Sequence, residues 1–450
     1  MIRIQQHISR LARIKFVRDT AILQVGTLIN IAATVLTSII VFRGLEPEGY
    51  GAYKLAVALY GTLTALDLTG LGPATSVRLS AALARGDGEA ARDVMAFYVK
   101  MSALVALIGL ALIGALGPAL AGAMYGAPTV GELARLLAAL LALEPAHALV
   151  ELALQCSRRM ARFAAMGALL ALANLGLIAA AVLGGRGPGG VIVARLAASA
   201  LLSGFGAIYY TLVRARLHAA LPALDEVLRR AFTVAIRPYI GFGFGIALDK
   251  SMASLFTLLP LQLLGSLHGG AAAGYLGLAQ SAISMPSSAF NAAMHNLGVR
   301  LPQDVGRGDY AALRRNFARA TAVLAAGGVA IFGLFALIAP WLLPFLYGEE
   351  AAPVVPIIAV MSLYGMVAAA GGSMGALYRA VQKVPGALLA KAATLAIMAL
   401  PGYWLIREHA EVGAAWTLTL LIALSVALTA ALVIPYLNRQ AGQENQQGRV

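Results

Sequence analysis

Stretches of about 20 apolar residues recur along the whole chain, and each is long enough to cross a hydrocarbon core about 30 Å thick. Only 12% of the 450 residues are charged, whereas soluble domains carry about 25%. The sequence therefore predicts a polytopic membrane protein. We expect its spans to be helices, because a backbone that faces lipid has to satisfy its own hydrogen bonds.

Twelve spans are predicted, which makes the expected fold an all-α membrane bundle. Leu and Ala dominate the spans, and the alternation typical of a membrane barrel is absent from the sequence. The single cysteine, Cys156, excludes an intrachain disulfide and a multi-cysteine metal site, and we expect neither a metal nor a cofactor. The predicted spans are 18–42, 50–71, 97–118, 133–155, 163–183, 190–213, 237–260, 270–292, 320–344, 354–377, 385–406 and 411–435.

The positive charges lie mostly on one side of these spans. Of the 34 Lys and Arg residues, 26 fall in the N-terminus, the C-terminus and alternate loops, and the opposite loops hold about four. Such a bias places the Lys-rich and Arg-rich side, and with it both termini, in the cytoplasm. We therefore interpret the net charge of +14 as a topology signal and expect no nucleic-acid partner.

The sequence repeats itself with a shift of 222 residues. VRLSAALARGDGEAARD (77–93) aligns with VRLPQDVGRGDYAALRR (299–315), and 15 of the 54 positions from 73 to 126 are identical. This predicts two six-helix lobes in a parallel repeat. The first would span 1–232, including the cytoplasmic linker 214–232, and the second would span 233–450 with a short polar cytoplasmic tail. We interpret the repeated Arg-Gly-Asp as a cytoplasmic turn with solvated Arg and Asp.

Two similar lobes that enclose a site at the membrane midplane are typical of alternating-access transporters. The chain has no GxxxxGK[ST] motif, so we do not expect it to hydrolyse ATP. The predicted external loops are short, which argues against a polymerase or ligase that has to hold a soluble acceptor. The sequence therefore favours a transporter over an enzyme.

Four cations lie inside the predicted spans or at their edges: Lys54, Arg195, Lys250 and Lys391. Each costs about 2.5–3.5 kcal/mol at the centre of a membrane helix. They line a cavity for an anionic ligand, or Lys250 pairs with a group on another span while Lys54, Arg195 and Lys391, which lie nearer the ends of their spans, extend to the membrane interface. These interpretations stay open. Asp249 precedes Lys250 directly, and adjacent helical residues do not face each other. We expect Asp249 to face a neighbouring helix or a second cation.

A second polar group lies in EPAHALVE (144–151), where Glu144, His147 and Glu151 share one helical face. A carboxylate metal bundle would need a second Glu-x-x-His, and the sequence has none. Because His titrates near neutral pH and membrane carboxylates often relay protons, these residues form a candidate coupling site for a proton or sodium ion. The alternative is a polar stripe that only holds helices together. Asp67 and Asn30 are further inward-facing polar candidates.

Several stretches resemble the oligosaccharide flippases of the polysaccharide exporter family. LEPEGYG (45–51) is similar to the turn after their first span, and DLTGLGPATSVR (67–78) to the segment after their second. ALDKSMASLFTLLPLQLLGSLHGGAAAGYLGLAQSAISMP (247–286) is similar to their stretch with an Asp-basic pair followed by GxY. The family belongs to the multidrug/oligosaccharidyl-lipid/polysaccharide exporter superfamily. The resemblance implies a V-shaped two-lobe fold.

The resemblance also implies a cargo, namely a polyprenyl-diphosphate-linked oligosaccharide for surface polysaccharides such as O-antigen. The polyprenyl tail can stay in lipid, but the charged headgroup needs a wet, cationic cavity. We therefore expect a flippase of the bacterial inner membrane, in association with polysaccharide assembly proteins. The alternative is a multidrug/cation antiporter of the same superfamily, whose cationic cargo would favour a cavity dominated by carboxylates.

Overall fold

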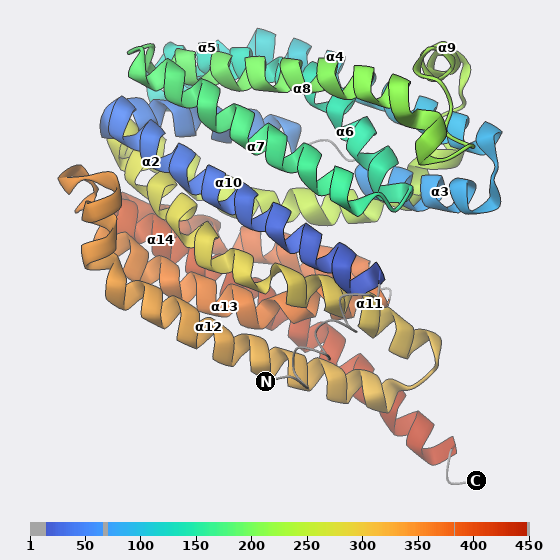
Figure 1. Cartoon of the computed structure of the whole chain (residues 1–450). Helices are drawn as coiled ribbons and strands as arrows, with labels where there is room; N and C mark the ends of the chain where they lie inside the picture. The colour runs from blue at the N-terminus through green and yellow to red at the C-terminus, as the bar shows by residue number, and fades with distance from the viewer. Residues whose placement is uncertain (1–14, 66–70, 382, 448–450) are drawn as a thin grey trace, which may run out of the picture. The chain divides into compact units, whose positions relative to one another are not determined.

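The structure is a computed structural model that describes residues 15–65, 71–381 and 383–447 (Figure 1). Within these ranges the chain forms helices and no strands. The helices are α2 (Lys15–Thr64), α3 (Leu71–Arg85), α4 (Gly88–Tyr125), α5 (Pro128–Ala138), α6 (Leu140–Cys156), α7 (Met160–Leu183), α8 (Gly187–Leu217), α9 (Leu224–Thr233), α10 (Arg237–Ser287), η1 (Ser288–Phe290), α11 (Asn291–Gly306), α12 (Tyr310–Tyr347), η2 (Glu349–Ala351), α13 (Val354–Ala380) and α14 (Val384–Gln447).

The described residues contain nine helical segments that are long and apolar enough to cross a membrane. Three of them are broken by a residue with positive φ: Glu46 (57°) in α2, Gly269 (87°) in α10 and Ala410 (45°) in α14. Each of these three therefore holds two spans, and nine segments with three internal breaks make twelve spans. This confirms the predicted all-α polytopic fold.

The internal repeat is present in the structure as well as in the sequence. Helix α4 covers Gly88–Tyr125 and α12 covers Tyr310–Tyr347, so their first residues and their last residues are both 222 positions apart. The break at Glu46 likewise matches the break at Gly269 to within one residue of this shift. The chain is thus built from two six-helix lobes in a parallel repeat.

The repeated Arg-Gly-Asp forms the same turn in both halves. Gly86 and Gly308 have φ values of 69° and 74°, a conformation that glycine adopts without strain. Asp87 Oδ1 accepts a hydrogen bond from the backbone N–H of Ala90 at 2.9 Å, and Asp309 Oδ1 does the same for Ala312 at 2.7 Å. The predicted turns are confirmed, but both aspartates are helix caps rather than simply solvated groups.

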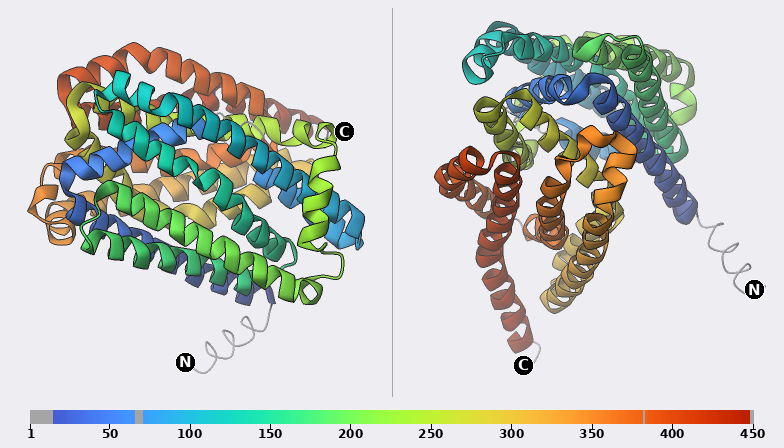
Figure 2. Two further views of the ribbon diagram at one scale, coloured as in Figure 1. Left: turned by 90° about the horizontal axis from the view of Figure 1, so that it is seen from above. Right: turned by 90° about the vertical axis from the view of Figure 1, so that its left-hand side faces the viewer.

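The contacts divide the chain into two compact units. The first consists of the described residues of Met1–Gly44, Thr69–Gly117 and Glu132–Phe244, and the second of those of Leu45–Leu68, Pro118–Gly131 and Gly245–Val450. In the first unit α7 and α8 lie side by side, and in the second α12, α13 and α14 do so (Figure 2). The boundary predicted at 232/233 stays a prediction.

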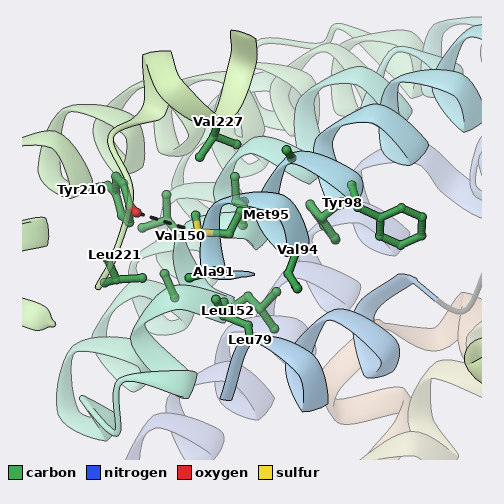
Figure 3. Packing of buried hydrophobic residues seen from close by; sticks show 14 of the residues in the cluster. Leu79, Ala91, Val94, Met95, Tyr98, Val150, Leu152, Tyr210, Leu221 and Val227 are labelled. Carbon is green, nitrogen blue, oxygen red and sulfur yellow. Dashed lines mark hydrogen bonds between the residues drawn. The ribbon is translucent and has the colours of Figure 1, made fainter. Parts of the chain in front are cut away.

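The core of the first unit fixes the linker helix α9 to α4 and α8 (Figure 3). The hydroxyl of Tyr210, which is 1% exposed, donates to the backbone oxygen of Pro222 at 2.8 Å. Arg230 binds Asp93 through two nitrogens at 2.6 and 3.1 Å. The linker is therefore folded and packed against the first unit, because the Tyr210 hydroxyl holds it just before α9 and the Arg230–Asp93 ion pair holds it near the end of α9.

The Tyr210 hydroxyl offers a test of this packing. Tyr210→Phe leaves the buried Pro222 oxygen without its donor, so we expect the free energy of unfolding to fall by about 1 kcal/mol. Tyr209→Phe is the matched control, since the neighbouring Tyr209 is only half-buried and stacks on Phe205. Thermal unfolding in detergent measures both variants, and equal midpoints would contradict this account of the linker.

In the second unit, the later part of α2 and the later part of α10 approach each other through glycines. A Cβ on Gly51 would lie 1.8 Å from the backbone oxygen of Gly270, and a Cβ on Gly274 would lie 2.3 Å from that of Pro47. These two helical parts are equivalents under the 222-residue repeat. Two backbones in direct contact position the side chains of both parts, including Lys54.

Candidate functional site

A buried ion cluster in the second unit centres on Asp249 of α10. One carboxylate oxygen accepts from Lys391 Nζ at 2.5 Å. The other accepts from the Tyr378 hydroxyl at 2.7 Å and from a guanidinium nitrogen of Arg379 at 3.3 Å. The carboxylate thus joins α10 to α13 and α14. The structure places Asp249 against neighbouring helices and against two cations.

The cluster has more positive than negative charge. Asp249 carries one negative charge and its side chain is 3% exposed, while Lys391 and Arg379 carry two positive charges and are 12% and 55% exposed. A buried carboxylate needs such partners, because an uncompensated buried charge is strongly destabilising. One of the two cations suffices to neutralise it, so the cluster keeps an excess of one positive charge.

Lys250 is separated from its neighbour Asp249 by the geometry of the helix. Asp249 is buried, and Lys250 is exposed. Successive residues in a helix point in different directions, which accounts for this division. The structure thus brings Asp249 and Lys391 together and leaves Lys250 outside their cluster.

Arg379 also lines a cavity of about 490 Å³ within the second unit. Sequence reasoning misses Arg379 as a site residue, because its position at the end of a predicted span is typical of a cytoplasmic topology charge. A signal was present, since Tyr378-Arg379 directly follows a predicted apolar span. The cavity is lined by Ser287, Phe290, Asn291, Met294, Gly298, Pro302, Phe332, Gly365, Ala368, Ala369, Gly372, Gly375, Ala376 and Arg379.

Lys54 forms a second cationic group in the same unit. It follows the break at Glu46 by eight residues, or about 12 Å along a helix. Its Nζ donates to the Ser281 hydroxyl at 2.8 Å and lies 5.2 Å from the centre of the Tyr50 ring. In the described ranges no carboxylate oxygen lies within 4.0 Å of this half-buried ammonium. Lys54 is therefore a cation deep in a span, and its hydroxyl and ring partners are neutral.

In the first unit, two of the polar residues predicted on α6 contact α8. Glu144 lies 3.7 Å from Arg195, and both side chains are partly exposed. His147 is buried, and its Nδ1 lies 3.4 Å from the hydroxyl of Ser203. Sequence spacing identified their common helical face, and the structure supplies the partners on α8.

Glu151 and Asn30 meet near a glycine of α7. A Cβ on Gly167 would lie 3.6 Å from Asn30 Nδ2 and 3.9 Å from a carboxylate oxygen of Glu151. The Asn30 amide donates to the backbone oxygen of Gly26 at 3.1 Å. Three helices therefore bring these polar groups close together, while the remaining candidate, Asp67, lies outside the described residues.

The described part of the chain contains no group of three or more His, Cys, Asp or Glu that is arranged to hold a metal ion. Asp249, Lys391, Lys54, Glu144 and Arg195 instead form contacts between helices of the membrane-spanning segments. This arrangement suits noncovalent binding of a charged ligand. Lys54 and Arg379 are the candidate donors, because their observed hydrogen bonds use only part of the N–H groups of the ammonium and the guanidinium.

Three solved structures show what kind of protein has this fold. An inward-facing multidrug resistance MATE family transporter of the MOP superfamily has a TM-score of 0.69 at 16% identity, over 93% of this chain and 96% of that one. A MOP superfamily transporter from Pyrococcus furiosus, described as having a binding pocket of reverse polarity, has a TM-score of 0.62 at 17% identity, over 95% and 96%. A eukaryotic MATE transporter has a TM-score of 0.66 at 14% identity, over 96% and 99%.

The fold and the charged spans together define a multi-pass membrane protein with the fold of MOP-superfamily transporters. Residues 16–296 match the family described as polysaccharide biosynthesis protein. The chain belongs to this family, which confirms the resemblance noted in the sequence. The comparison with curated proteins returns no match.

Proposed function

We propose that the protein flips a polyprenyl-diphosphate-linked oligosaccharide across the bacterial inner membrane by alternating access, with both termini in the cytoplasm. The observation that carries this proposal is Lys54, a cation deep in a span with no carboxylate beside it in the described residues. The family match to polysaccharide biosynthesis proteins supports a glycan cargo.

The energetics of membrane charges favour an anionic ligand at Lys54. A cation at the centre of a span costs about 2.5–3.5 kcal/mol, and such residues almost always pair with one another or line a pathway. The Ser281 hydroxyl accepts one of the three hydrogen bonds that the ammonium can donate, and the cation–π interaction with the Tyr50 ring contributes about 0.5–2 kcal/mol. A diphosphate headgroup would supply the missing negative charge while its lipid tail remains in the bilayer.

No covalent step is needed for this function, so we propose a transporter rather than an enzyme. The Glu144–His147–Glu151 face of α6 is the proposed coupling site for a proton or sodium ion, with Asn30 beside Glu151. Arg195 lies against Glu144 and stays a proposed anion-binding residue, which adjoins the coupling face. Polysaccharide assembly proteins are the proposed partners that receive the flipped glycan.

The alternative function is a multidrug/cation antiporter, and Glu151 favours it. Among the side chains that the structure describes, no lysine or arginine nitrogen lies within 4.0 Å of the Glu151 carboxylate. A membrane carboxylate of this kind suits a cationic cargo in the same way that Lys54 suits an anionic one. Transport of an anionic lipid and of a cationic dye by the same purified protein separates the two functions.

Replacement of Lys54 tests the leading proposal. Hydrogen bonds to charged groups contribute about 1.5–3 kcal/mol, so Lys54→Gln is expected to slow flipping of a lipid-diphosphate sugar by about 10- to 100-fold. Lys54→Arg keeps the charge and is expected to retain most of the rate. Lys383→Gln is the control for an equal change of charge, since Lys383 is exposed and lies over the Tyr436 ring. A normal rate in Lys54→Gln would argue against the proposal.

Lys250 needs a separate test because its predicted place in the substrate site remains a proposal. If it contacts the headgroup, Lys250→Ala lowers the flipping rate while the protein keeps its thermal unfolding midpoint, since an exposed side chain contributes little to packing. A normal rate in this variant would remove Lys250 from the site.

A further inference from the structure

Very small side chains of α13 line one side of the cavity beside Arg379, and the side chains of Phe332 and Met294 pack closely against two of its glycines, Gly365 and Gly372. Gly365, Gly372 and Gly375 form this side together with three alanines, and the other lining residues come from the last residue of α10 and from η1, α11 and α12. At about 490 Å³, the cavity falls within the range of about 300–1,000 Å³ that is usual for small-molecule sites. Its polar lining residues are Ser287, Asn291 and Arg379.

Arg379 lies along this side of the cavity rather than entirely within the ion cluster. One guanidinium nitrogen lies 3.9 Å from the point that a Cβ on Gly375 would occupy, one helical turn before Arg379. The side chain is 55% exposed, although it reaches Asp249 at 3.3 Å. The absence of a side chain at Gly375 therefore keeps the guanidinium accessible from the cavity.

The charges around Arg379 leave it available to a ligand. Lys391 and the Tyr378 hydroxyl approach the Asp249 carboxylate more closely than Arg379 does, at 2.5 and 2.7 Å against 3.3 Å. A guanidinium has five N–H donors in a fork that matches phosphate oxygens. The contact to Asp249 uses Nη2, the same terminal nitrogen that lies nearest Gly375, and the guanidinium also lies over the Tyr378 ring at 5.6 Å.

We infer that the cavity beside Arg379 is a binding subsite for a phosphate-bearing anion, whose oxygens bind the Arg379 guanidinium and the Asn291 amide. The inference rests on the proposed function and deepens it, since it adds to Lys54 a second group of named residues in the second unit for the phosphates of the cargo. Asp249 acts as the internal competitor that holds Arg379 in place until an anion arrives. Lys391 keeps Asp249 neutralised when Arg379 turns to the ligand.

Binding of inorganic pyrophosphate to the purified full-length protein tests this subsite, with titration calorimetry in detergent at constant ionic strength. We expect Arg379→Gln to weaken the affinity at least 10-fold and Arg379→Lys to weaken it less, because lysine keeps the charge but loses the fork. Gly375→Leu is a second variant that fills the cavity without changing any charge, and we expect it to weaken binding at least 10-fold as well.

Arg319→Gln is the matched control, since Arg319 lines a different cavity of the same unit, of about 370 Å³. Unchanged affinity in this variant, with losses in Arg379→Gln and Gly375→Leu, supports the subsite. Unchanged affinity in Arg379→Gln, or no saturable binding of pyrophosphate to the unaltered protein, overturns it.

The flipping assay is read separately, so that the two proposals can fail independently. A protein that binds pyrophosphate through Arg379 but flips no lipid-diphosphate sugar contradicts the function and supports the subsite. A protein that flips such a lipid with its pyrophosphate affinity unaffected by Arg379→Gln supports the function and contradicts the subsite.

Discussion

Replacing Lys391 by Met is expected to lower the free energy of unfolding by about 1.5–3 kcal/mol, the contribution of a hydrogen bond to a charged group, because Arg379 still neutralises Asp249. The Lys391 ammonium lies 2.5 Å from the Asp249 carboxylate and 3.1 Å from the Asp249 backbone oxygen. Without it, the buried carboxylate keeps only the Tyr378 hydroxyl and the more exposed Arg379. Met has nearly the same shape as the lysine stem, so the loss reports the charge rather than a cavity.

The double variant Asp249→Asn/Lys391→Met is the control, because it removes both charges of the close pair. It should recover a large part of the lost stability, since an amide leaves no buried negative charge unpaired. Thermal unfolding of the purified variants in detergent measures the effect. If Lys391→Met unfolds at the same temperature as the unaltered protein, the Asp249 cluster does not hold α10, α13 and α14 together.

Gly51→Ala is the second substitution with a large expected effect. The new Cβ would lie 1.8 Å from the backbone oxygen of Gly270 and 3.1 Å from the backbone nitrogen of Gly274. Backbone atoms cannot turn away as a flexible side chain would, so the two helical parts have to separate. We expect a destabilisation at or above the upper end of the range of about 1–3 kcal/mol for overpacked sites.

Gly114→Ala serves as the matched control for this substitution. Gly114 lies within the apolar helix α4, and a Cβ placed there meets no atom within 4 Å. We expect its unfolding midpoint and its yield in the membrane fraction to stay unchanged, while both fall for Gly51→Ala. Equal behaviour of the two variants would show that the close contact of α2 and α10 is unimportant for stability.

The sequence was sufficient to predict the spans and the repeat because both depend on local pattern. A span such as 354–377 is visible as a continuous apolar run, and the structure has α13 at Val354–Ala380. The helices α3, α9 and α11 were not predicted as helices, since short segments with polar residues lack that signal. The glycine turns that follow α3 and α11 were nevertheless predicted from the repeated Arg-Gly-Asp, whereas the capping of α4 and α12 by its aspartates was not.

The candidate site was only partly predictable, because its contacts join residues far apart in the chain. Asp249 and Lys391 were both candidates, but nothing in the local sequence pairs two residues that are 142 positions apart. Arg379 was missed because a cation at the end of a span is normally a topology signal. The common face of Glu144 and His147 followed from helical spacing, whereas Arg195 and Ser203 as their neighbours required the packing of α8 on α6.

The central claim is that the membrane-spanning segments bind an anionic lipid headgroup through cations whose charge is not fully neutralised by neighbouring carboxylates. The most direct measurement uses vesicles that contain the purified protein and a fluorescent polyprenyl-diphosphate sugar, with a membrane-impermeant quencher to count molecules in the outer leaflet. We predict protein-dependent exchange between leaflets that Lys54→Gln slows by about 10- to 100-fold. No exchange of this lipid, together with uptake of a cationic dye by the same vesicles, would contradict the account.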